Sequence, residues 1–417
     1  MALKYSQLGE RQEESGIVRL MTVALERPEL LSLAAGFTDN ATLPILDVQS
    51  IVADIQSNDV EAKKVLQYGT NQGRPGLREM LARRIEQFDG KVEGTYGSEN
   101  LFVTNGSQQG LYLAMLTLCD PGDIVLIEQP TYFVFLEILK GLGIEAMLLP
   151  MAADGEVDCE KTGALVDSLV ESGRIDRLKA LYLVSYFANP TGHSVSKEAK
   201  EKLARILVDK APHVAYIEDA AYRDMYFEEE FDGSSVLSIA DSGKLSVMYS
   251  STLTKPFATG LKVGYGYCND EDWLNRMLAV KGQQDFGTSN FCQAILERAL
   301  QNGDFDLNLS LLRNSYQSKM ETLDSVLRKE LEEMGWGWVR PLGGLYLWLK
   351  APNGLRTDFD SDFHEACLKE GVMYVPGDLC CGTGSLRDHI RLSFGVLGTS
   401  DLKEAGRRFC RAARLFC

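Results

Sequence analysis

The chain has 417 residues, of which 45% are hydrophobic and 24% charged, as in a globular protein that can bury a large core. The formal net charge of -16 repels phosphate backbones, so we expect no nucleic-acid partner. No apolar run approaches the ~18 residues of a membrane span, so we expect no membrane association, and residues 1–16 contain no apolar stretch typical of a signal peptide.

Cysteine and histidine usage argues against a metal site. Nine cysteines are scattered along the chain, only Cys380 and Cys381 are adjacent, and there are four histidines. Adjacent cysteines are poor disulfide partners, and neither a CxxC pair nor a Cys/His ligand spacing occurs. Reduced thiols, and hence a cytoplasmic protein, are expected.

Residues 1–49 are predicted to form an N-terminal arm that is part of a small domain. Helical spacing covers 16–25, and a short strand is expected at 31–37, running into a glycine. A dense cluster of turn-forming residues at 68–76 then precedes a helix predicted at 77–88.

From residue 101 onward, short apolar strands alternate with helices. Continuously apolar strands are typical of a parallel sheet that helices cover on both faces. We therefore predict an α/β protein whose large domain spans 50–303. Strands are expected at 101–104, 124–127, 146–149, 180–184, 214–217 and 245–249, and helices at 111–118, 133–140 and 197–208.

The pattern changes near residue 303, and 304–417 is predicted to be a smaller α+β domain. It opens with one long charged helix at 307–334. Strands at 345–348 and 390–393 follow, with helices beginning near 360 and 402.

Unusual residues follow several predicted strands, where open parallel sheets bind ligands. Gly106, Ser107 and Gln108 stand between a strand and a helix, where backbone N–H groups and the helix dipole suit a phosphate. A glycine turn with a serine N-cap describes this segment equally well.

Two further strand ends carry polar residues. Asn189 lies in an Asn-Pro-Thr-Gly sequence, which is also a common turn. Asp219 directly follows an apolar strand, where an unpaired carboxylate is costly, although a helix N-cap would also explain it. Asn189 and Tyr222 are placed to donate to a phenolate oxygen, and Asp219 to pair with a protonated ring nitrogen.

In residues 250–264, four hydroxyl residues precede Lys255, and a glycine-bearing turn and a second cation, Lys262, follow it. Lysine forms Schiff bases with carbonyl compounds once its pKa is lowered. Taken alone, a solvated lysine in a polar turn is the commoner explanation of such a stretch.

Taken together and in their order along the chain, these candidate site residues resemble those of the fold type I pyridoxal-phosphate enzymes of the class I and II aminotransferase branch. Its motifs are most similar to the kynurenine/α-aminoadipate aminotransferase subgroup and related bacterial aminotransferases. The resemblance covers nearly the whole chain. It rests on the segments 33–36, 68–69, 104–110, 128–132, 189–192, 341–344 and 390–394.

The resemblance implies a role for each residue around the cofactor, pyridoxal 5'-phosphate. Lys255 would hold it as an internal aldimine and later move a proton as general base and acid. Asp219 would keep the ring nitrogen protonated, while Asn189 and Tyr222 bond the ring oxygen. Tyr132 would stack on the ring. The phosphate would be held by Gly106, Ser107, Gln108, Thr252 and Lys262, with Tyr68 contributed by the second subunit of a homodimer.

The resemblance also implies a substrate site. Arg391 would grip the substrate α-carboxylate, helped by Asn189 and the backbone of Gly36. A surface ion pair between Arg391 and Asp388 is the alternative. Arg19 would meet an acidic or aromatic substrate tail, or would only pair with Glu26 or Glu29.

Several positions depart from the family pattern. Lys262 replaces the usual arginine, Thr259 the usual proline and Ala221 a frequent proline, while Pro256 directly follows the anchoring lysine. Lysine holds a phosphate as a point charge without the fork of arginine. These changes leave room for a reaction other than transamination.

The implied activity is transfer of an amino group from an L-amino acid to a 2-oxo acid by a ping-pong mechanism. A lyase, or an oxidase or hydroxylase acting on an amino acid, would use the same cofactor. An effector-sensing module without catalysis is a remote alternative, since such modules follow a winged helix-turn-helix and this chain starts with the arm. The sequence does not identify the substrate pair.

Overall fold

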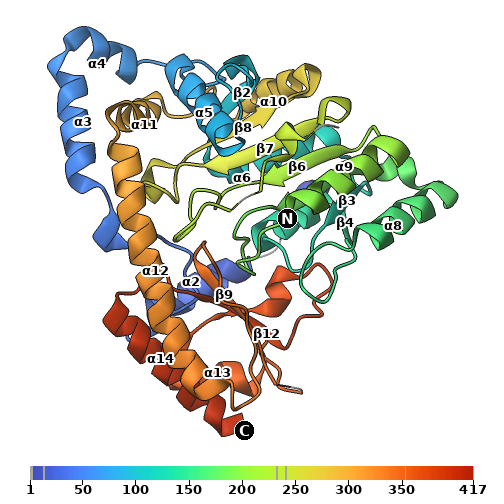
Figure 1. Ribbon diagram of the computed structural model, residues 1–417, viewed down its shortest axis with the longest axis vertical. Helices are drawn as coiled ribbons and strands as arrows, with labels where there is room; N and C mark the ends of the chain where they lie inside the picture. Colours follow the sequence, from blue (N-terminus) through green and yellow to red (C-terminus); the bar gives the residue numbers. More distant parts are fainter. Residues whose placement is uncertain (1–2, 13–14, 232, 240–241, 353, 417) are drawn as a thin grey trace.

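The protein, seen here in a computed structural model, contains a large helix-covered sheet and a smaller α+β unit (Figure 1). The structure describes residues 3–12, 15–231, 233–239, 242–352 and 354–416, so part of the segment considered for a leader lies outside the described residues. The large sheet has the strand order β2-β8-β7-β6-β5-β3-β4. Its strands are β2 (Leu101–Asn105), β3 (Ile124–Ile127), β4 (Glu145–Leu148), β5 (Leu178–Val184), β6 (Ala215–Asp219), β7 (Val247–Thr252) and β8 (Val263–Cys268).

Both faces of this sheet are buried, which explains the continuously apolar strands. In β3, Ile124 and Leu126 point into one hydrophobic core, whereas Val125 and Ile127 point into another on the opposite face. The first core is closed by helices that include α5 (Pro75–Phe88), α9 (Lys197–Lys210) and α11 (Asn290–Asn302). The second is closed by α6 (Gly106–Leu118), α7 (Phe133–Leu142) and α10 (Glu271–Gln284).

The smaller unit is built on a three-stranded antiparallel sheet of order β11-β12-β9. The long helix α12 (Asp304–Leu331) runs beside it and contacts both α11 and α14 (Figure 1). Strand β1 (Leu31–Ser32) of the arm pairs with β10, which joins the arm to this unit. The remaining elements are β9 (Tyr346–Lys350), β10 (Val372–Met373), β11 (Val375–Pro376), β12 (His389–Ser393), α13 (Asp362–Lys369) and α14 (Thr399–Ala413).

The predicted fold class is confirmed, with one refinement of strand direction. Strands β3 to β7 are mutually parallel, but β8 is antiparallel to both of its neighbours. The short connection from β7 reverses the chain, so β8 must run back beside it. This strand was not predicted, because Gly264 and Gly266 dilute its apolar pattern.

Helices account for most of the other differences. Apart from the helix at 16–25 and the short strand at 31–37, no regular element was predicted before residue 68. That helix is α2 (Gly16–Glu26), and the structure adds α3 (Ile45–Ser57) and α4 (Asp59–Leu66). The strand expected at 31–37 is reduced to β1. Within the described residues, we find no helix with the length and apolarity needed to cross a bilayer.

Candidate active site

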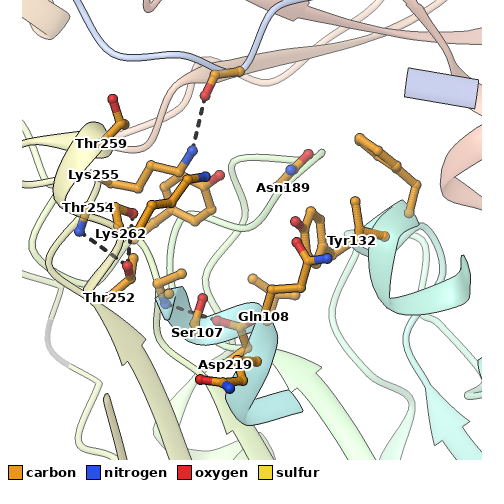
Figure 2. A pocket seen from close by; sticks show the side chains of 18 of the residues that line it. Ser107, Gln108, Tyr132, Asn189, Asp219, Thr252, Thr254, Lys255, Thr259 and Lys262 are labelled. Carbon is orange, nitrogen blue, oxygen red and sulfur yellow. Dashed lines mark hydrogen bonds between the residues drawn. The ribbon is translucent and has the colours of Figure 1, made fainter. Parts of the chain in front are cut away.

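A cavity of about 820 Å³ lies at the carboxyl ends of β5, β6 and β7, and Lys255 lines it. Figure 2 shows Lys255, Lys262 and three threonines on one side of the cavity and Tyr132 on the other. The residues predicted for the site that line this cavity are Gly36, Gly106, Ser107, Gln108, Tyr132, Asn189, Asp219, Tyr222, Thr252, Lys255, Lys262 and Arg391.

Lys255 is held on the connection that follows β7, and its Nζ donates a hydrogen bond to the Gly36 carbonyl oxygen at 3.0 Å. No carboxylate of the described residues lies within ion-pair distance of this amine. Burial lowers the pKa of Lys255. The neighbouring Tyr346 acts against this shift, whereas the positive charges of Arg391 and Lys262 add to it. A lowered pKa places the amine closer to its neutral, nucleophilic form than that of a solvated lysine, which disfavours the polar-turn alternative.

The turn from β2 into α6 forms a backbone cradle at one end of the cavity. Gly106 has φ 72, a conformation that favours glycine. A Cβ added to Gly264 of β8 would lie 2.4 Å from both Gly106 C and Ser107 N, so strand and cradle touch directly. Ser107 lies inside α6, whose N-cap position is Asn105, so the serine N-cap alternative is wrong. The Asn105 side chain makes no capping bond, and Gly106, Ser107 and Gln108 line the cavity, where the N–H groups of a helix start suit an anion.

The cradle is supported from behind by Asp285, which the sequence did not single out. Its carboxylate accepts bonds from Asn105 Nδ2 at 3.0 Å and Gln109 Nε2 at 2.9 Å, and pairs with Lys281 at 3.0 Å. Asp285 lies just beyond α10, so it connects that helix to the start of α6. No local motif marks such a contact between residues 180 positions apart.

Asp219 lies at the end of β6 and is buried beneath the cavity. Its Oδ2 accepts a bond from the Tyr182 hydroxyl at 2.9 Å, and its Oδ1 accepts one from the Ala221 N–H at 3.0 Å. Burial raises the pKa of Asp219 to about 6, against the effect of these two donors. The chain after Asp219 forms a turn and not a helix, so the N-cap alternative is wrong.

Arg391 is the most deeply buried cation of the site, with 1% of its surface exposed. Its two terminal nitrogens donate to Asn189 Oδ1 at 2.9 Å and to the Ala34 carbonyl at 2.7 Å. Asp388 pairs with His389 instead, at 2.7 Å, so the alternative of an Arg391–Asp388 surface pair is wrong. A buried guanidinium with only neutral partners among the described residues is a ready site for a carboxylate.

Tyr346 was missed by the sequence prediction, although its side chain lines the cavity. Its hydroxyl lies 3.1 Å from the hydroxyl of Tyr222, and its ring centroid lies 4.3 Å from the Arg391 guanidinium carbon. A tyrosine inside an apolar strand resembles an ordinary core residue, so the sequence offers no signal for this position.

Two predicted residues lie outside the cavity in this single chain. Tyr68 is 80% exposed, and its ring packs edge-on against Phe286 with centroids 5.8 Å apart. Arg19 lies over the Phe359 ring at 4.6 Å and borders a separate hollow, whereas Glu29 pairs with Arg27.

The observations just given suit pyridoxal 5'-phosphate. The cavity is lined by an amine with no carboxylate partner among the described residues, by an uncapped helix start beside a glycine contact, and by a buried carboxyl group. An α/β fold of this kind with a lysine so placed defines the class of pyridoxal-phosphate enzymes of fold type I. No cluster of three or more metal-ligating side chains occurs among the described residues.

Comparison with known proteins identifies the family. The model for "Aminotransferase class I and II" matches residues 28–409. A 2-aminoadipate transaminase of Thermus thermophilus is 26% identical over 97% of this chain and 96% of its own. The multiple substrate aminotransferase of Thermococcus profundus superposes with a TM-score of 0.88 at 25% identity, covering 99% of this chain and 97% of the other.

A further solved structure carries a bound group. An α-aminoadipate aminotransferase from Thermus thermophilus, complexed with N-(5'-phosphopyridoxyl)-L-leucine, superposes with a TM-score of 0.83 at 26% identity over 98% of this chain and 97% of its own. The chain therefore belongs to the class I and II aminotransferase family. It is an aminotransferase that uses pyridoxal 5'-phosphate.

Proposed function

We propose that Lys255 is the residue that binds the cofactor and that then moves the proton at the substrate Cα. The observation that carries this proposal is its half-buried amine, which among the described residues is hydrogen-bonded only to a carbonyl oxygen and has a lowered pKa. The cofactor supplies an aldehyde that condenses with amino groups and a ring that accepts electrons. The Gly36 carbonyl oxygen accepts a hydrogen bond from the free Lys255 amine, and the surrounding burial excludes water.

The cofactor phosphate is assigned to the cradle of Gly106, Ser107 and Gln108, with Thr252 and Lys262 beside it. The uncapped start of α6 supports this assignment, as does the position of Thr252 and Lys262 on the same wall of the cavity. Lys262 has φ 57, an uncommon conformation for lysine, which the turn between β7 and β8 imposes. Its ammonium attracts phosphate as a point charge.

Asp219 is assigned to the protonated ring nitrogen, Asn189 and Tyr222 to the ring oxygen, and Tyr132 to the ring face. All four side chains line the cavity around the Lys255 amine. Arg391 is assigned to the substrate α-carboxylate with Asn189 and the Gly36 backbone. Its buried, carboxylate-free guanidinium supports this role.

We further propose a homodimer in which Tyr68 completes the phosphate site of the partner. Tyr68, Phe286 and Leu66 are exposed apolar side chains, and the first two are in contact.

The division into an arm at 1–49, a large domain at 50–303 and a small domain at 304–417 stays a prediction, as does a cytoplasmic location. In the described structure Arg19 lies over the Phe359 ring. The proposed contact of Arg19 with the substrate tail therefore requires the arm to take a different position.

Transamination is tested by a half-reaction without oxygen and without a 2-oxo acid. Mixed with a suitable amino acid, the holoenzyme should convert its cofactor to pyridoxamine phosphate and release one equivalent of 2-oxo acid. Release of pyruvate and ammonia would instead indicate a lyase, and a stall until oxygen is admitted would indicate an oxidase or hydroxylase. A panel of acidic, aromatic and branched amino acids, scored by bleaching of the visible band, identifies the substrate.

The affinity for the cofactor should fall as the pH drops below about 6. Burial raises the pKa of Asp219 to about 6, and below that value the protonated carboxyl no longer pairs with a protonated ring nitrogen. Each further pH unit should weaken binding by up to about tenfold. The dissociation constant of the apoprotein for the cofactor, measured from pH 5 to 8, checks this. Asp219→Asn should not show this loss of affinity at low pH. If the affinities of the two proteins depended on pH in the same way, the assignment of Asp219 to the ring nitrogen would be contradicted.

A further inference from the structure

We propose that the Tyr346 hydroxyl is a positioning group that orients the Tyr222 hydroxyl toward the cofactor and thereby lowers the proton affinity of the Lys255 nitrogen. The inference rests on the proposed roles of Lys255 and Tyr222. It adds a residue of the small unit, on β9, to a cofactor site otherwise formed by the large sheet.

The position of the hydroxyl supports this role. Tyr346 is 2% exposed, and its oxygen lies 3.1 Å from the Tyr222 oxygen, with the two rings edge-on at 5.8 Å. A Cβ added to Gly36 would lie 2.8 Å from the same oxygen, and the Gly36 carbonyl accepts the bond from Lys255. The Tyr346 hydroxyl thus lies where the arm, Tyr222 and the Lys255 amine meet.

The direction of the Tyr222–Tyr346 bond follows from counting protons. Each phenol has one proton to donate. When Tyr222 donates to an oxygen in the cavity, Tyr346 must be the donor between the two hydroxyls. A hydroxyl that accepts a hydrogen bond is a stronger donor in turn, so Tyr346 strengthens the bond from Tyr222 to the cofactor ring oxygen. A better-stabilised ring oxygen shares less of its charge with the Lys255 nitrogen, which then binds its proton more weakly.

The ring of Tyr346 has a separate contact, which the test must keep intact. The Arg391 guanidinium lies 4.3 Å from the ring centroid, so loss of the whole side chain would disturb the proposed carboxylate site. Tyr346→Phe removes only the hydroxyl and retains the ring. The other titratable or charged side chains lining the cavity are Tyr112, Tyr132, Asp219, Tyr222, Lys255, Lys262 and Arg391, and all of them remain in this variant.

The experiment is a pH titration of the visible absorbance band of the holoenzyme, which reports protonation at the Lys255 nitrogen without turnover. We expect the midpoint in Tyr346→Phe to rise by roughly 0.3 to 1 pH unit, a twofold to tenfold gain in proton affinity. Tyr222→Phe should raise it more, and the double variant should match Tyr222→Phe, because Tyr346 acts through Tyr222. Tyr374→Phe, which removes a buried hydroxyl bonded to the Thr357 carbonyl, is the matched control and should leave the midpoint unchanged.

An unchanged midpoint in Tyr346→Phe, or two shifts that add in the double variant, would overturn the inference while leaving the proposed function standing. A wild-type protein without a titrating visible band would instead contradict the proposed function itself. The retained melting temperature of each variant shows that a shift does not come from unfolding.

Discussion

Lys255→Ala should leave a folded protein without a visible cofactor band and with turnover reduced by a factor of roughly 10⁴ or more. The variant loses both the amine that binds the cofactor and the group that moves the substrate proton. Absorbance after loading with pyridoxal 5'-phosphate and a transamination assay with the best amino acid of the panel measure both losses.

An exposed lysine provides the matched control for this variant. Lys369 forms a helical ion pair with Glu365 on the surface, and Lys369→Ala should keep full activity. Lys255→Arg retains a cation yet should also lose the band, since a guanidinium does not condense with the aldehyde. A wild-type absorbance band in Lys255→Ala would show that another residue anchors the cofactor.

Arg391→Ala should lower kcat/KM by an amount equivalent to about 2–5 kcal/mol while the cofactor band remains. The buried guanidinium would no longer meet the substrate α-carboxylate, and Asn189 Oδ1 and the Ala34 carbonyl would lose their donor. Saturation kinetics with several amino acids should show the same loss for each of them, because every α-amino acid carries that carboxylate.

Arg391→Lys tests the geometry of this site, because the variant keeps the positive charge but loses the two parallel N–H donors of the guanidinium. We expect a loss of kcat/KM smaller than that of Arg391→Ala. Arg340→Ala breaks only an exposed pair with Glu321 and should have little effect. A loss confined to amino acids with one type of side chain would assign Arg391 to the side-chain pocket instead.

The sequence predicted the central strands and most of the cavity lining for definite physical reasons. Strand β3 coincides with the predicted 124–127, because a strand buried on both faces has an unbroken apolar run that Pro121 and Gly122 precede. Gly106 and Lys255 each follow a strand and Asp219 is the last residue of one, and the order of the sheet brings these strand ends together.

What the sequence did not reveal depends on contacts between distant segments. Tyr346 enters the site only because β9 pairs with β12, which also carries Arg391. Asp285 supports the cradle through hydrogen bonds from two side-chain amides that are distant in sequence. Strand β8 escaped prediction because its glycines interrupt the apolar pattern. Tyr68 lies on the outer surface of a single chain, and its proposed role requires a second one.

The covalent position of the cofactor tests the account most directly. The holoenzyme is treated with borohydride, digested and mapped by peptide mass spectrometry. We predict that the reduced pyridoxyl group is found on Lys255, in the peptide that spans the end of β7 and the start of β8. A modification on Lys262 or on any other lysine, with Lys255 unmodified, would contradict the central claim.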